Sequence, residues 1–238
     1  MKYAEPRFLI CSDTALCVEF GDEISEELAG LVRAFGALLA ASGIPGVYET
    51  VPTYRSVLIH YEPGVLTYAQ LVQRLRLLCR QLDTVTIEKK PPIRVPVLYG
   101  GEWGPDLPFV AEHSGLTEEE EVVRLHCEPV YLIYMLGFTP GFSYLGGMDE
   151  RIATPRLKSP RVRIPAGSVG IAGSQTGIYP IDSPGGWQLI GQTPFVLYDP
   201  NRQDPILFEA GEYIQFYPIG EREFYRIKDE QTGGERYD

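Results

Sequence analysis

Apolar side chains in residues 1–90 switch between the spacing of strands and the spacing of helices. The run 56–61 has the two-residue alternation of a half-buried strand, whereas 25–41 and 67–82 repeat apolar residues every three or four positions, as amphipathic helices do. Further strands are predicted at 7–11, 15–20 and 47–52. The order ββαββα, followed by a further strand, predicts an α+β domain with two helices on one face of a small antiparallel sheet.

This pattern breaks at Pro91-Pro92, because consecutive prolines disfavour helix and remove donors from a strand ladder. We therefore predict two domains. The small α+β domain (ββαββα) covers residues 1–90, and a second domain covers residues 91–238.

The second domain is predicted to be mainly β. After a strand at 93–98, two short helices are expected at 105–113 and 117–126, the latter opened by a capping box of Thr117 and Glu120. From residue 130 onward, short apolar runs separated by Gly, Pro and Asp predict a closed or nearly closed β-barrel.

Charge and composition narrow the class of partner. The 238 residues are 44% hydrophobic, which is enough for real cores, and carry a formal net charge of -11, which opposes binding to nucleic acid or to anionic membranes. A DNA-reading helix pair at 107–126 is disfavoured because its second helix begins with glutamates. The four cysteines form no C-x-x-C pair, and no run approaches the roughly 20 apolar residues of a membrane span. We expect a cytoplasmic protein with reduced thiols.

Glycine, proline and aromatic residues are densest between residues 137 and 193. This part contains the segments GFTPGFSYLGG at 137–147, RVRIPAGSV at 161–169 and SPGGWQLIG at 183–191. Glycine permits close approach of backbones, proline fixes φ, and aromatic rings between them form rigid walls. We interpret this stretch as the functional face.

Basic residues gather in the same part of this acidic chain. They are Arg151, Arg156, Lys158, Arg161 and Arg163. Arginine suits a carboxylate or a phosphate, but the alternation of Arg161 and Arg163 equally fits the solvent face of a strand. Neutral partners and walls for a pocket are offered by Tyr144, Gln175, Tyr179, Ser183, Trp187 and Gln188.

Of the three histidines, His60, His113 and His126, only His126 ends a predicted helix that leads into the glycine-rich stretch. It is a candidate for proton transfer, although a histidine at a helix C-terminus also compensates the helix dipole. The sequence has no P-loop and no G-x-S-x-G elbow, and its His and Cys residues lack the paired spacing of metal ligands, so no metal site is predicted.

Motifs along nearly the whole chain resemble one protein family. They include VLYGG at 97–101, GPDL at 104–107, GF-x-PGF at 137–142, PAGSV at 165–169, QTG at 175–177 and SPGGW at 183–187. The family is the one that contains the B subunit of 5-oxoprolinase, the sporulation-kinase inhibitor KipI and the first subunit of allophanate hydrolase.

The resemblance implies a cyclophilin-like barrel after the small domain. It also implies a 5-oxoprolinase complex with a homologous C subunit and with an A subunit, which opens 5-oxoproline to glutamate at the expense of ATP. Whether this chain itself binds ATP is left open. The alternatives are a KipI-like inhibitor of a sensor histidine kinase and an allophanate hydrolase or carboxyltransferase-like subunit.

For lactam opening we infer roles from residue chemistry. The hypothesis gives anion contact to Arg156, Arg161 and Arg163, and proton transfer to His126. Positioning of substrate or intermediate is given to Gln175, Tyr179 and Gln188, with Tyr144, Ser183 and Trp187 as further binding residues.

Overall fold

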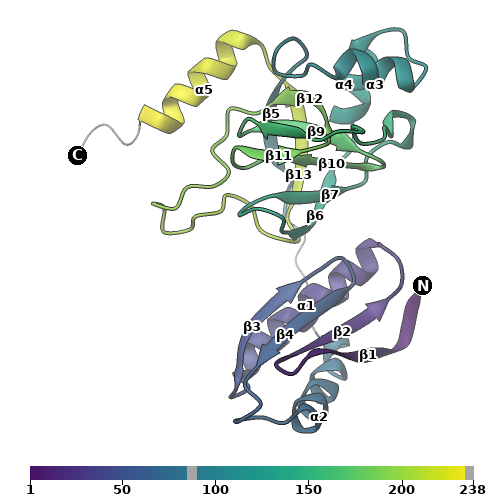
Figure 1. Cartoon of the computed structure of the whole chain (residues 1–238), viewed down its shortest axis with the longest axis vertical. Coiled ribbons are helices and arrows are strands. Elements are labelled where there is room, and N and C mark those ends of the chain that lie inside the picture. Colours follow the sequence, from purple (N-terminus) through teal and green to yellow (C-terminus); the bar gives the residue numbers. More distant parts are fainter. Residues whose placement is uncertain (85–89, 234–238) are drawn as a thin grey trace. The chain divides into compact units, whose positions relative to one another are not determined.

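The structure is a computed structural model that describes residues 1–84 and 90–233. The chain divides into two compact units, Met1–Lys89 and Lys90–Asp238 (Figure 1). Each unit has its own hydrophobic core and is described separately.

The first unit contains a four-stranded antiparallel sheet in the order β1-β2-β4-β3. Its elements are β1 (Lys2–Ser12), β2 (Ala15–Gly21), α1 (Glu26–Ser42), β3 (Val47–Pro52), β4 (Ser56–Tyr61), α2 (Tyr68–Cys79) and the short 3-10 helix η1 (Leu82–Thr84). Alternate residues of the central strands, Leu16, Val18, Val57 and Ile59, are buried against the two helices.

Local signals fix the ends of these helices. Ser25 caps α1 by accepting from the Leu28 N–H, and Gly43 ends it in the left-handed region at a φ of 53°. Thr67 and Gln70 form a capping box at the start of α2, which ends at Cys79, earlier than the predicted boundary. The further strand predicted after this helix falls on 85–89, outside the described residues.

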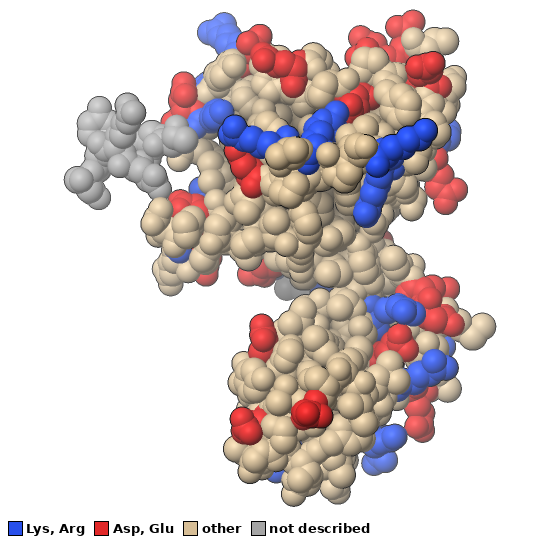
Figure 2. Space-filling view, in the orientation of Figure 1, with Lys and Arg blue, Asp and Glu red and all other residues tan. Residues whose placement is uncertain are grey.

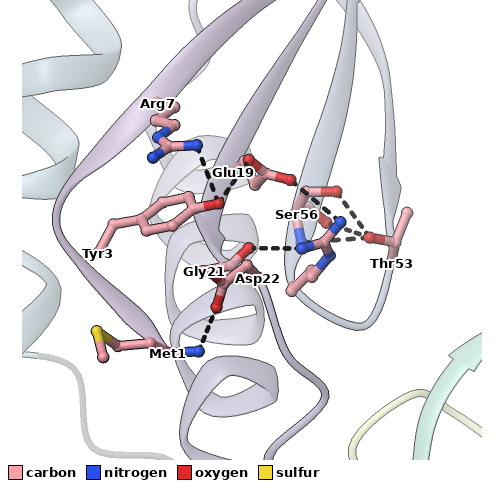
Figure 3. Close-up of polar contacts among 9 residues, drawn as sticks. Met1, Tyr3, Arg7, Glu19, Gly21, Asp22, Thr53 and Ser56 are labelled. Atoms are coloured by element: carbon pink, nitrogen blue, oxygen red, sulfur yellow. Dashed lines mark hydrogen bonds and ion pairs between the residues drawn. The ribbon is translucent and has the colours of Figure 1, made fainter.

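A polar network lies on the other face of this sheet (Figure 3). The Glu19 carboxylate accepts from the Tyr3 hydroxyl at 3.2 Å and pairs with Arg55 at 3.3 Å. Arg7 lies over the Tyr3 ring, 3.9 Å from its centroid. Arg55 also donates to the Gly21 carbonyl, so the network joins β1, β2 and the turn before β4. Both of its arginines are already engaged, which favours a stabilising role over a binding one.

The second unit is a closed barrel in the strand order β10-β7-β6-β13-β5-β12-β9, which confirms the predicted barrel. Its strands are β5 (Ile93–Tyr99), β6 (Tyr131–Leu136), β7 (Ser143–Gly146), β9 (Ser168–Ala172), β10 (Gln175–Ile178), β12 (Gln188–Gln192) and β13 (Tyr213–Pro218). A separate two-stranded sheet pairs β8 (Arg161–Ile164) with β11 (Ser183–Gly185).

Three α-helices and one 3-10 helix accompany the barrel in the described residues. They are α3 (Leu107–His113), α4 (Glu119–Cys127), η2 (Glu150–Ile152) and α5 (Glu221–Gly233). The capping box predicted for Thr117 and Glu120 is wrong: α4 begins one residue later than that pattern requires, with Glu118 at the N-cap and no side-chain capping bond. Glutamates in the first turn stabilise this end through the helix dipole instead.

The barrel wall separates two hydrophobic clusters. Ile171 and Ile190 belong to the main core, whereas their strand neighbours Ala172 and Leu189 belong to a smaller cluster with Phe142, Ile164, Tyr179 and Trp187. Since adjacent strand residues point to opposite faces, the smaller cluster lies on the outer face of the barrel, under β8 and β11. Within the described residues no helix is long and apolar enough to cross a membrane.

Candidate functional site

A cavity of about 290 Å³ opens against the smaller hydrophobic cluster. Its lining residues are Phe138, Phe142, Tyr144, Arg156, Pro160, Tyr179, Pro184, Gly185, Gly186 and Trp187. All of them come from the stretch that is densest in glycine, proline and aromatic residues. We call this cavity the aromatic pocket; its volume is close to the lower end, about 300 Å³, of the range for small-molecule sites.

Phe142 is the centre of the aromatic wall. Its ring meets those of Tyr144, Tyr179 and Trp187 edge-on, with centroids 4.9, 5.2 and 5.4 Å away. Phe142 is 2% exposed and Trp187 6% exposed, so packing locks their rotamers. The wall is therefore rigid before any ligand enters.

A strained turn forms the rim of the pocket. Phe138 has a φ of 68°, the only positive φ of a non-glycine residue in the described part of the chain. The Thr139 N–H donates to the Gly137 carbonyl at 2.8 Å, which closes a γ-turn around Phe138. The side chain of Phe138 is 63% exposed and meets Phe142 edge-on. Strain that displays an exposed aromatic ring beside a cavity is typical of a binding site.

Two glycines allow the close packing around the pocket. A Cβ on Gly185 would overlap the Tyr179 hydroxyl and come within 2.8 Å of Ile164 Cδ1. A Cβ on Gly177 would lie 3.0 Å from both Trp187 Cζ3 and the Ser143 carbonyl oxygen. The glycines of the SPGGW and QTG motifs thus keep the floor and wall of the pocket in contact.

Arg156 is the cation of the pocket. Its guanidinium lies over the Trp187 ring, 5.9 Å from the centroid, and within residues 1–84 and 90–233 it has no ion pair. Figure 2 shows Lys and Arg side chains in a band across the barrel face on which β9, β10 and β11 are seen in Figure 1. An exposed arginine beside an aromatic wall suits the carboxylate of a small ligand.

Arg161 has a different environment. Its Nη2 donates to Asp106 Oδ1 at 2.7 Å and its Nη1 to the Trp187 carbonyl at 3.3 Å. The second oxygen of Asp106 accepts from the Leu189 N–H at 2.6 Å. Arg161 therefore holds the backbone directly at Trp187 and through Asp106 at Leu189, and its charge is already paired. We call this contact the Asp106–Arg161 brace.

The other predicted polar residues are dispersed. Arg163 is exposed and paired with Asp182, so β8 presents it to solvent. Gln188 donates to the Pro155 carbonyl at 2.8 Å, and its Oε1, like the Ser183 hydroxyl, is buried without a hydrogen-bond partner in the described residues. Gln175 begins β10, is half-buried and does not line the aromatic pocket. Burial raises the pKa of the Tyr179 phenol to about 12, which keeps it protonated as a donor.

His126 lies inside the barrel. Tyr99 donates to its Nδ1 at 2.7 Å, and its Nε2 donates to Thr176 Oγ1 at 2.8 Å, because that hydroxyl is itself committed to donating to the Gly170 carbonyl. The imidazole stacks on Phe216 with centroids 4.5 Å apart. Thr176 faces the interior and its neighbour Gly177 faces the aromatic pocket, so His126 and the pocket lie on opposite faces of β10.

Desolvation lowers the pKa of His126 from 6.5 to about 3. As pH falls below 6.5 the unfolded chain binds this proton and the folded chain does not, so stability is full above pH 6.5 and is lost toward pH 3. We expect this residue to contribute a slope of about 1.4 kcal/mol per pH unit. Urea unfolding between pH 4 and 7 should show a shallower dependence for His126→Gln than for the wild type. The exposed control His113→Gln should keep the wild-type slope, and equal slopes in all three proteins would contradict the assignment.

Comparison with known proteins identifies the family of this chain. It belongs to the carboxyltransferase domain family, subdomains C and D, whose match covers residues 6–208. This confirms the family resemblance predicted from the sequence.

The relatives carry a more specific name. The chain is 42% identical to the 5-oxoprolinase B subunit of Bacillus subtilis (strain 168), across 92% of this chain and 95% of that protein. It is 39% identical to the protein of the same name from Escherichia coli O157:H7, across 89% of this chain and 95% of that one. This name implies that these relatives work with other subunits.

A solved structure shares the fold. The crystal structure of TTHA0988 matches 87% of this chain with a TM-score of 0.78 and 37% identity. The match covers 40% of the chain in that crystal structure, which therefore continues well beyond the part that resembles this protein.

The structure adds residues to which the sequence assigned no role. Asp106, 55 positions from Arg161, is the partner that fixes that arginine. Phe138 forms the rim of the pocket through a backbone conformation that no local propensity predicts for phenylalanine. These two residues lie in the GPDL and GF-x-PGF motifs, which were the features of the sequence that could have pointed to them. Among the described residues no group of His, Cys, Asp and Glu is arranged to hold a metal ion.

Proposed function

We propose that this chain is the B subunit of an ATP-dependent 5-oxoprolinase, which opens 5-oxoproline to glutamate together with the A and C subunits. The observation that carries the proposal is the aromatic pocket, a small cavity with a rigid apolar wall and an arginine free of ion pairs to described residues. A five-membered lactam with one carboxylate matches it: the ring packs on Phe142 and Trp187, and the carboxylate faces Arg156. The names of the relatives support the same substrate.

The reaction explains the need for ATP and for several subunits. Amide resonance stabilises the lactam, so the lactam oxygen first takes the γ-phosphoryl group of ATP and ADP leaves. Water then adds to the activated ring carbon, the C–N bond breaks, and the nitrogen takes up a proton. A second water hydrolyses the resulting acyl phosphate to glutamate and phosphate. The contribution of this chain is to bind and orient the ring and to exclude water until activation.

ATP itself is not matched by the aromatic pocket alone. A triphosphate needs several cations or backbone donors, and Arg156 is the one basic residue among the pocket's lining residues. We therefore propose that the other subunits supply most of the phosphate contacts. His126 faces away from the pocket. It retains the predicted proton-transfer role only if His126→Gln lowers the kcat of the folded complex, and not only the free energy of unfolding of this chain.

The test is ATP-dependent release of glutamate from 5-oxoproline by purified proteins. We expect release from the mixture of this chain with its A and C subunits, and no release when this chain is omitted. An assembled but inactive mixture would overturn the proposal and favour a kinase inhibitor or a carboxyltransferase-like subunit.

Two arginines of the same stretch form a matched pair for testing the pocket. Arg156→Ala should raise KM for 5-oxoproline by about 10- to 100-fold, because a charge-assisted hydrogen bond contributes about 1.5–3 kcal/mol. Arg163→Ala removes an equal charge from an exposed ion pair with Asp182 and should change KM less than about 2-fold. Equal effects of the two substitutions would mean that the general charge of this face, rather than the pocket, attracts the substrate.

We also propose that the barrel is cyclophilin-like and that the two units are separate domains meeting at Pro91-Pro92. Limited proteolysis tests the second point: both fragments should survive as folded species after cleavage near this junction.

A further inference from the structure

A second hollow lies on the barrel unit and shares no residue with the aromatic pocket. Its volume is about 940 Å³. It is lined by Tyr99, Gly100, Gly101, Leu107, Glu119, Glu120, Val123, Arg124, Cys127, Glu128, Pro218 and Ile219. These residues come from one side of α4, from the ends of the parallel strands β5 and β13 with the residues that directly follow them, and from the first residue of α3. We call this hollow the α4 groove.

The floor of the α4 groove is apolar. Tyr99, Val123, Cys127 and Ile219 are half-buried, and Leu107 is 2% exposed. Burying apolar side chains away from water is favourable in free energy. A contiguous apolar hollow on a charged surface therefore marks an interaction site. The groove is open at its edge, where Gly101, Glu120 and Pro218 are exposed, so it suits an extended occupant rather than an enclosed small molecule.

The floor is also preorganised. The Tyr99 hydroxyl is held by His126 Nδ1 at 2.7 Å and approaches the Cys127 thiol at 3.4 Å. The buried His126 thus fixes the orientation of the Tyr99 ring on the floor of the groove. Because this side chain is already fixed, the protein loses less conformational entropy when an occupant binds.

The rim of the groove is acidic. Arg124 is already paired with Glu121 and Glu128, at 3.7 and 3.1 Å. Glu119 and Glu120 have no ion pair with any residue of 1–84 or 90–233. Figure 2 shows acidic side chains gathered on the part of the barrel unit that carries α3 and α4. The resulting negative field repels phosphate groups and attracts lysine and arginine.

We propose that the α4 groove docks a segment of a partner protein that has apolar side chains for the floor and lysine or arginine beside Glu119 and Glu120. Charge complementarity selects this occupant, because a second copy of this chain is itself acidic, with a net charge of -11. The choice of the A and C subunits as the partners to test rests on the proposed function. The aromatic pocket, which shares no residue with the groove, remains available for substrate in such a complex.

Titration calorimetry of the full-length chain against the purified C subunit, and in a separate experiment against the purified A subunit, tests the proposal. We expect one of them to bind with an affinity that falls as salt rises. The double substitution Glu119→Lys and Glu120→Lys should weaken binding at least about 10-fold and flatten the salt dependence. Glu112→Lys, at an exposed position of α3 outside the groove, reverses one charge and should change Kd less than about 2-fold.

A thiol readout locates the contact independently. Cys127 lines the groove, so alkylation by iodoacetamide, followed by mass spectrometry, should be slower in the complex than in the free chain. The exposed Cys11 of the first unit is the internal control and should react at the same rate in both states. Because these measurements follow binding and not turnover, they separate failure of the docking site from failure of the 5-oxoprolinase proposal.

The inference is overturned if neither partner protein binds the wild-type chain, if the double charge reversal leaves Kd unchanged, or if Cys127 alkylates equally fast in the complex. Circular dichroism of the variants checks that they are folded, and the lysine substitutions lie at exposed positions in the first turn of α4.

Discussion

Gly104→Ala is expected to destabilise the barrel unit by at least about 3 kcal/mol, near the upper end of the cost of overpacking. A Cβ at this position would overlap the carbonyl of Ile190 and come within 2.7 Å of the Gly100 N. Both obstacles are backbone, so neither can rotate away. Moving them would break the bonds from Gly104 N–H to the Gly100 carbonyl and from Gly100 N–H to the Ile190 carbonyl.

Urea unfolding followed by far-ultraviolet circular dichroism measures this effect. Gly36→Ala is the matched control, because Gly36 lies within α1 and a Cβ there would meet no atom within 4 Å. Alanine should stabilise that helix by about 1 kcal/mol. A Gly104→Ala protein as stable as the wild type would mean that the close approach of residues 104 and 190 is not a feature of the folded protein.

Asp106→Ala is expected to cost about 3 kcal/mol of stability, at most the lower end of the range for breaking a buried ion pair, because this pair is only part-buried. The substitution leaves the Arg161 guanidinium, whose side chain is 29% exposed, without its counter-charge, and it removes the acceptor of the Leu189 N–H. Because Arg161 also donates to the Trp187 carbonyl, the wall of the aromatic pocket should loosen and Trp187 should become more accessible to acrylamide quenching.

The double variant Asp106→Ala with Arg161→Met separates charge from packing. Once both charges are gone, the penalty of an unpaired guanidinium disappears, so the double variant should be more stable than Asp106→Ala alone. Glu230→Ala breaks an exposed pair with Arg226 on α5 and should cost less than about 0.5 kcal/mol. If Asp106→Ala behaves like Glu230→Ala, the Asp106–Arg161 brace does not hold the pocket.

Much of the fold could be predicted from periodicity. The strand at 56–61 occurs where its alternation predicted it, the strand at 47–52 has the predicted bounds, and α1 begins and ends at its capping residues. Helix α5 was not predicted, because its sequence is strongly polar and, among its described side chains, Phe224 alone is fully buried. A helix with so few buried apolar side chains has too weak an apolar period to be recognised from the sequence.

The candidate site could be predicted only in part. Arg156, Tyr144, Tyr179 and Trp187 line one pocket because they lie on turns and strands that glycine and proline bring together. The sequence could not show that Arg161 is held in an ion pair whereas Arg156 faces the pocket, since the partner of Arg161 is remote in the chain. Nor could it show which face of the barrel His126 occupies, because that depends on the register between β10 and its neighbours.

Every residue that lines the aromatic pocket lies between positions 138 and 187, within one contiguous fifth of the sequence. Gene fusion or fission leaves such a site whole, because a breakpoint outside this segment keeps all of its residues on one chain. Polypeptides of very different length can therefore inherit the same pocket intact, while the choice of which neighbouring activities share its chain remains free to change.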